Sequence, residues 1–62
     1  MIDIGPEQQA IDDAYAKYVG DLFKTLITGL VTKQDEADCV KRFATGLEFA
    51  RRAKELATKA VQ

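Results

Sequence analysis

The stretch Gly46–Ala60, GLEFARRAKELATKA, decides the fold because small residues recur in it at helical spacing. The small residues are separated by 4, 3, 4 and 3 positions, which places them on one stripe of an α-helix: Gly46, Ala50, Ala53, Ala57 and Ala60. A stripe of small side chains lets a neighbouring helix approach closely. The stretch therefore predicts a helix over residues 36–61 that packs antiparallel against a second helix.

The larger apolar residues of this helix lie on more than one side. Phe49 and Leu56 share a side with Ala53 and Ala60, whereas Val40, Phe43 and Leu47 lie on another. A helix that is apolar on several sides has to bury several sides.

Residues 6–32 are expected to form the other helix. Pro6 and Glu7 suit a helix start, since proline needs no N–H partner in the first turn and an acid meets the positive end of the helix dipole. Apolar residues then recur at helical spacing in a broad stripe: Ile11, Tyr15, Tyr18, Val19, Leu22, Phe23, Leu26, Ile27, Leu30 and Val31. At Gly20 and Gly29 the sequence favours close approach by a neighbouring helix over a kink or a ligand cleft.

The break between the helices is expected at residues 32–35. Asp35, Glu36 and Asp38 suit capping of the second helix, and a metal site there would need opposing ligands that the chain does not offer. The expectation is one all-α domain over residues 1–62, a two-helix antiparallel hairpin.

A lone hairpin of 62 residues leaves one flank of each helix in water. The single cysteine, Cys39, cannot close a disulfide, so self-association is the expected source of further stability. We expect a symmetric homo-oligomer, a dimer or larger. Cys39 itself is expected to be a small buried residue, with a reactive thiol in the first turn of the helix as the alternative.

Composition limits the function. The chain has no His, Ser, Asn or Trp, which removes imidazole bases, Ser-His-Asp triads and His-ligated zinc, so neither an enzyme nor a cofactor is expected. The longest uncharged stretch is the eight residues 25–32, which is too short to span a membrane. A net charge of −1 provides no global attraction for nucleic acid, and the single cysteine indicates a cytoplasmic location.

Several polar residues are candidates for ligand binding. Arg51 and Arg52, with Lys54, could form a phosphate-binding edge, or could pair with acids one turn away on a solvated face. Tyr15 and Tyr18 could stack on a base or pack in the core, and Thr45 could bond a ligand or its own helix.

The segment Arg42–Ala53, RFATGLEFARRA, resembles the second helix of small phage-encoded hairpin proteins that sequester nucleotide immune signals, the anti-CBASS and anti-Thoeris sponges. The resemblance implies a non-catalytic anti-defence protein of the host cytoplasm, a symmetric oligomer that binds a cyclic oligonucleotide or ADP-ribose-type signal at subunit interfaces. By position it implies ligand contacts from Thr45, Arg51 and Arg52. It also implies base stacking by Tyr15 or Tyr18 and a phosphate contact from Lys24.

Two other functions stay open from the sequence. A Rop-like hairpin dimer that binds paired RNA would need a basic face on the first helix, where only Lys17 and Lys24 are available. A structural or protein-partner-binding bundle would need no nucleotide at all.

Overall fold

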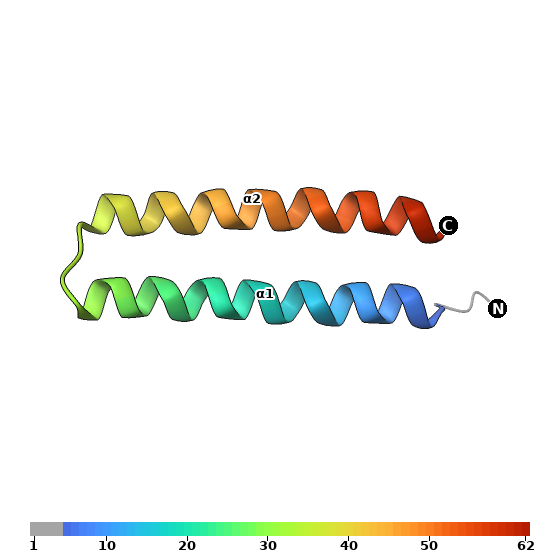
Figure 1. The fold of residues 1–62 in the computed structure, drawn as a ribbon, viewed down its shortest axis with the longest axis horizontal. Coiled ribbons are helices and arrows are strands. Elements are labelled where there is room, and N and C mark those ends of the chain that lie inside the picture. The colour runs from blue at the N-terminus through green and yellow to red at the C-terminus, as the bar shows by residue number, and fades with distance from the viewer. Residues whose placement is uncertain (1–4) are drawn as a thin grey trace.

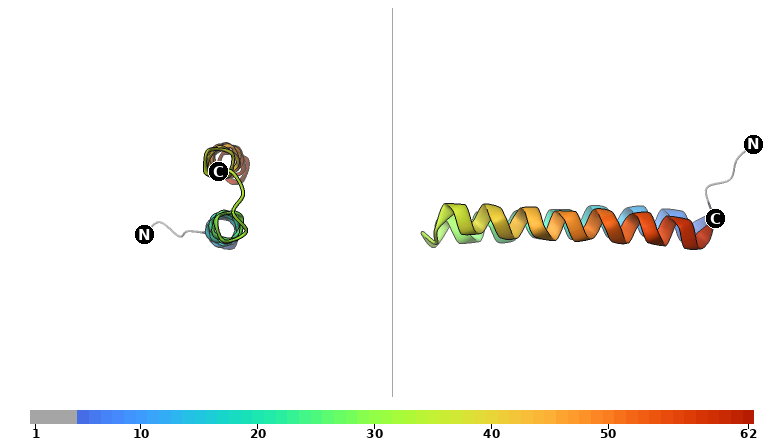
Figure 2. Two further views of the ribbon diagram at one scale, coloured as in Figure 1. Left: turned by 90° about the vertical axis from the view of Figure 1, so that its left-hand side faces the viewer. Right: turned by 90° about the horizontal axis from the view of Figure 1, so that it is seen from above.

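The structure, a computed structural model that describes residues 5–62, is a two-helix antiparallel hairpin (Figure 1). Helix α1 spans Pro6–Val31 and helix α2 spans Glu36–Val61, and the two pack side by side along their whole length (Figure 2). The predicted all-helical hairpin is confirmed, and α1 ends one residue earlier than expected because Thr32 forms its C-cap. Residues 1–4 of the predicted domain lie outside the described residues.

The end of α1 is a Schellman motif without glycine. The N–H of Gln34 donates to the carbonyl of Gly29 at 2.9 Å, and that of Lys33 donates to Leu30 at 3.1 Å. Lys33 has a φ of 61°, in the left-handed region that glycine usually fills in this motif. A lysine in this place explains why the sequence carried no glycine signal for the break.

The start of α2 is capped by a side chain, as predicted. Asp35 Oδ1 accepts hydrogen bonds from the N–H groups of Ala37 at 2.8 Å and Asp38 at 3.3 Å. The carboxylate thereby satisfies donors that the first turn of a helix leaves unpaired.

Two close contacts hold the helices together. A Cβ built on Gly29 would stand 2.6 Å from Cys39 Sγ, and one built on Gly46 would stand 2.6 Å from Leu22 Cδ2. Close approach at Gly29 is therefore confirmed, and so is burial of Cys39, which is only 4% exposed. The prediction of close approach is wrong at Gly20, because nothing lies within 4 Å of a Cβ built there.

The small-residue stripe forms the helix contact only in part. Ala50 is buried and Gly46 and Ala57 are half-buried, but Ala53 and Ala60 are exposed. The reason is that Lys54, not Ala53, turns toward α1, where its ammonium lies 4.6 Å from the centre of the Tyr15 ring.

The hairpin has almost no core of its own. Within residues 5–62 only Cys39 and Ala50 count as buried apolar residues. Many large apolar side chains are exposed instead: Tyr18, Phe23, Ile27, Leu30, Val31, Val40, Phe49, Leu56 and Val61. Neither of the described helices is long and apolar enough to cross a membrane.

Candidate functional site

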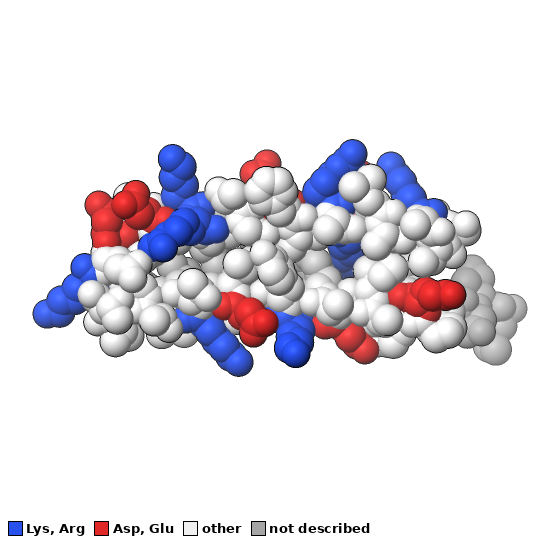
Figure 3. Space-filling model, in the orientation of Figure 1, with Lys and Arg blue, Asp and Glu red and all other residues white. Residues whose placement is uncertain are grey.

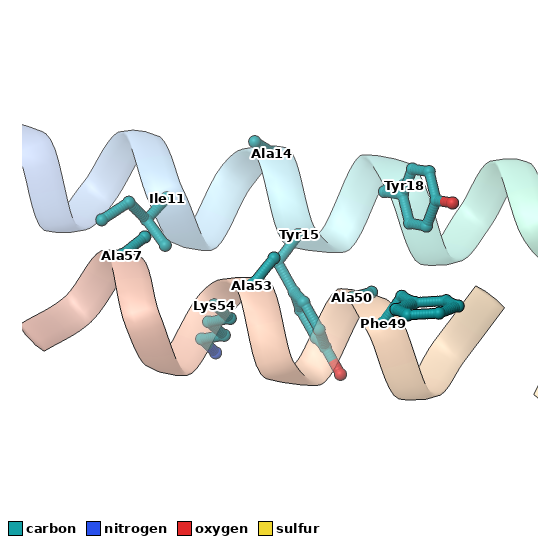
Figure 4. A pocket seen from close by; sticks show the side chains of 9 residues that line it. All are labelled: Ile11, Ala14, Tyr15, Tyr18, Phe49, Ala50, Ala53, Lys54 and Ala57. Carbon is teal, nitrogen blue, oxygen red and sulfur yellow. The ribbon is translucent and has the colours of Figure 1, made fainter. Parts of the chain in front are cut away.

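An open groove of about 460 Å³ lies between the helices in the half of the hairpin away from the turn (Figure 4). Tyr18 of α1 and Phe49 of α2 stand at one end of it, and Ile11 and Ala57 face each other at the other. Ala50 and Ala53 also line it, and their small side chains leave its space unfilled. The remaining lining residues are Ala14, Tyr15 and Lys54. The groove is thus apolar and aromatic, with one cation.

Lys54 connects this groove to a second hollow. Its ammonium lies over the Tyr15 ring and 3.6 Å from Asp12 Oδ1. A cation over an aromatic face is attracted by the electron density of the ring, so Tyr15 and Lys54 hold each other in place.

The second hollow, about 450 Å³, is a wide-open part of the surface with several cations at its border. Three cations border it together with one acid and several polar groups: Tyr15, Arg51, Lys54, Glu55, Thr58, Lys59 and Gln62. Such a hollow offers several donors to an anion, with the Tyr15 ring beside them.

Glu55 forms an ion pair with only one of the two consecutive arginines, Arg51 and Arg52. Its Oε1 accepts a hydrogen bond from Arg52 Nη1 at 2.6 Å and lies 3.7 Å from Lys59 Nζ. Arg51 takes part in none of the ion pairs found between residues 5 and 62. Glu55 thus pairs with its helical neighbours Arg52, three residues before it, and Lys59, four residues after it, and not with Arg51.

The predicted ligand residues are brought together only in part. Tyr15 and Tyr18 share the groove, and Tyr15 and Arg51 share the second hollow. Successive residues of a helix are turned by about 100°, so Arg51 and Arg52 cannot line the same side. Arg52, Thr45 and Lys24 line neither hollow, and all three are exposed.

Phe49 lines the groove but was not predicted from the sequence as a ligand contact. The sequence placed it only on the apolar side of its helix that also carries Leu56, Ala53 and Ala60. Its signal was its position directly before the small Ala50, which turns a large ring onto the flank of a tight helix contact. Whether Phe49 lies near Tyr18 depends on how α1 and α2 align, and the pattern within one helix does not predict that alignment.

The acids at the start of α2 have a structural role. Asp35 caps the helix, and the part of the chain that the structure describes holds no cluster of three potential metal ligands.

Comparison of the chain with models of protein families, with curated proteins and with solved structures finds no match in any of the three.

Proposed function

We propose that the protein is non-catalytic, assembles with copies of itself, and sequesters a phosphate-bearing nucleotide signal where copies meet. The observation that carries this proposal is the Tyr15 ring with the Lys54 ammonium 4.6 Å from its centre, between an aromatic groove and a hollow that Arg51 borders. The resemblance of Arg42–Ala53 to phage-encoded sponges of nucleotide immune signals points the same way.

The second hollow offers groups that suit both parts of a nucleotide. Aromatic rings stack on bases whatever their identity, and Tyr15 borders this hollow as well as the groove. Arginine presents a planar fork of donors to phosphate oxygens, and Lys54 adds a second cation. Both parts of the ligand would therefore be met at the second hollow, in the half of the hairpin away from the turn.

Exposed apolar surface on the single hairpin supports the self-association in this proposal. Phe49 is 70% exposed and Phe23 is 55% exposed. Broad uncharged surface crosses both helices in Figure 3, between charged side chains at its margins. Apolar surface of this extent on a small protein marks an interaction site.

We propose binding without catalysis because the carboxylates nearest the two hollows are already engaged by cations of the chain. Asp12 lies against Lys54, and Glu55 lies between Arg52 and Lys59. Neither carboxylate is left free to act on a substrate, which supports binding over catalysis.

Native mass spectrometry of the protein with cyclic dinucleotides, cyclic trinucleotides and ADP-ribose derivatives tests the proposal. We expect a symmetric homo-oligomer whose mass increases by whole ligand masses for one class of nucleotide. An assembly that ignores the whole panel contradicts nucleotide sequestration. A dimer that shifts only with an RNA stem-loop supports the Rop-like function instead.

A further inference from the structure

The exposed apolar side chains form two patches on opposite faces of the hairpin. In α1, Ala14 and Tyr18 come directly before the half-buried residues Tyr15 and Val19. In α2, Phe49 likewise comes directly before the buried Ala50. Residues in this position line the groove, so they share one face of the hairpin, here called the groove face (Figure 4). Its apolar residues form the distal patch, away from the turn: Ala14, Tyr18, Phe49, Ala53 and Leu56.

A residue that directly follows a contact residue is turned by about 100° the other way and lies on the opposite face. Phe23 follows Leu22, Leu30 follows Gly29, and Val40 follows Cys39. The apolar residues in this position form the turn patch, in the half of the hairpin nearest the turn: Phe23, Ile27, Leu30, Val40 and Leu47. All of them except the half-buried Leu47 are at least 43% exposed.

The groove face is therefore apolar in its distal half and polar in its turn half. The opposite face is apolar in its turn half and polar in its distal half. The turn half of the groove face carries Thr25, Asp38 and Arg42, whereas the distal half of the opposite face carries Asp12 and Arg51. A flat dimer that pairs either face with itself covers only one patch and leaves the other in water.

From this pattern we infer that a second copy of the chain docks its opposite face, running antiparallel, on the groove face of the first. Reversing the direction of the second copy lays its turn patch over the distal patch of the first. The polar halves then meet as well, and Arg42 on α2 of one copy comes to the level of Asp12 on α1 of the next. Complementary charges of this kind fix orientation and register.

Contact area favours this arrangement over pairing of each patch with itself. The hairpin extends 50 by 16 Å along its two longer axes, so docking over a whole face covers about twice the surface that pairing of one patch, half a face, would cover. Larger buried area is what distinguishes specific interfaces from incidental contacts.

Docking of one face on a different face continues beyond two copies, since each added copy presents a free patch again. The arrangement rests on the self-association in the proposed function and not on its ligand. It also brings the groove-face residues Arg42 and Thr45 of one copy toward the face that carries Arg51 in the next, which is the junction where the proposed function puts its ligand.

Two matched variants, Phe49→Glu in the distal patch and Phe23→Glu in the turn patch, test the arrangement without any ligand. Native mass spectrometry and sedimentation are expected to show the wild-type protein larger than a dimer and each variant alone as a monomer. An equimolar mixture is expected to give a 1:1 dimer, because the intact groove face of Phe23→Glu can dock on the intact opposite face of Phe49→Glu. Helical circular dichroism should rise on mixing if the separate variants are poorly folded.

Other results overturn the inference. Variants that each form homodimers show that each patch pairs with itself, and a mixture that gains neither mass nor helix shows that the faces do not dock. Phe49→Ala and Phe23→Ala repeat the test with milder changes. Lys41→Gln, on the outward side of α2, matches the charge change of the glutamate variants and should leave the wild-type mass unaltered.

Discussion

Leu22 occupies the space that a side chain at Gly46 would need. Its Cδ2 atom lies 2.6 Å, and its Cδ1 atom 3.2 Å, from the position of a Cβ at residue 46. The glycine thus lets a large side chain of α1 press against the backbone of α2. With the matching contact of Cys39 and Gly29 nearer the turn, it sets the spacing of the helices.

Gly46→Ala is expected to lower the thermal midpoint, although alanine is the better helix former. The gain of about 1 kcal/mol in helix propensity is opposed by an overpacking cost of roughly 1–3 kcal/mol, because Leu22 has to move. Gly20→Ala is the control, since nothing lies within 4 Å of its Cβ, and it should stabilise by up to about 1 kcal/mol. Thermal unfolding at one protein concentration measures both. If Gly46→Ala stabilises as much as Gly20→Ala, the close contact is absent in solution.

Asp35→Ala should destabilise the protein by about 1 kcal/mol, because the cap of α2 loses its acceptor for the N–H groups of Ala37 and Asp38. Asp35→Asn keeps an acceptor oxygen and should retain most of the stability. Urea unfolding followed by circular dichroism distinguishes the two. Equal losses in both variants would mean that charge, and not the hydrogen bonds, stabilises this end.

Lys33→Gly should raise stability by as much as about 1 kcal/mol. The backbone at residue 33 has a φ of 61°, where a Cβ is unfavourable and glycine is not. Lys33→Ala, which keeps a Cβ, is the matched control and should show no such gain. The difference between the two unfolding free energies is the measured quantity, and a value of zero contradicts the left-handed conformation at this position.

Ala53→Glu should break the assembly and leave the hairpin contacts unchanged. Ala53 is exposed where it lines the groove, so a charge placed there stays in water in a single hairpin but is buried by whatever copy covers the distal patch. Sedimentation should show a smaller species whose thermal midpoint depends less on protein concentration. A variant that keeps the wild-type mass would show that the distal patch is not an interface.

Arg51→Glu should abolish binding of the phosphate-bearing ligand, and the mass of the assembly is measured alongside because Arg51 lies on the face that docks. Arg51 borders the hollow beside Tyr15 and Lys54, and reversing its charge would repel a phosphate. Arg52→Gln is the control on the same helix, because Arg52 points elsewhere and pairs with Glu55. Titration with the ligand found in the nucleotide panel measures both affinities. Binding that survives Arg51→Glu removes the phosphate role from this residue.

The helices and their ends followed largely from local sequence. Pro6 and Asp35 mark helix starts by chemistry that acts within one turn, so both could be assigned without knowledge of the partner helix. The left-handed conformation of Lys33 could not be predicted in this way. Hydrogen bonds of the turn hold it, and a lysine in the sequence gives no sign of that conformation.

The candidate site was predictable as a set of residue types but not as a place. Tyr15 and Arg51 could be named from their chemistry, and their meeting in one hollow required the alignment of α1 with α2. For Arg52 the sequence left the partner undecided, because Glu48 lies four residues before it and Glu55 three residues after it. The structure pairs Arg52 with Glu55.

The sequence by itself determined a pair of long helices, the turn between them and the surplus of apolar side chains, because spacing along one helix fixes which residues share a side. Only the tertiary structure decided which of those sides becomes the helix contact. Gly46 and Gly29 accept Leu22 and Cys39 at close range, and this register turns Phe49 to one face and Phe23 to the other. The physical reason is that burial is shared between elements, so the exposure of a side chain depends on the neighbour as much as on its own helix.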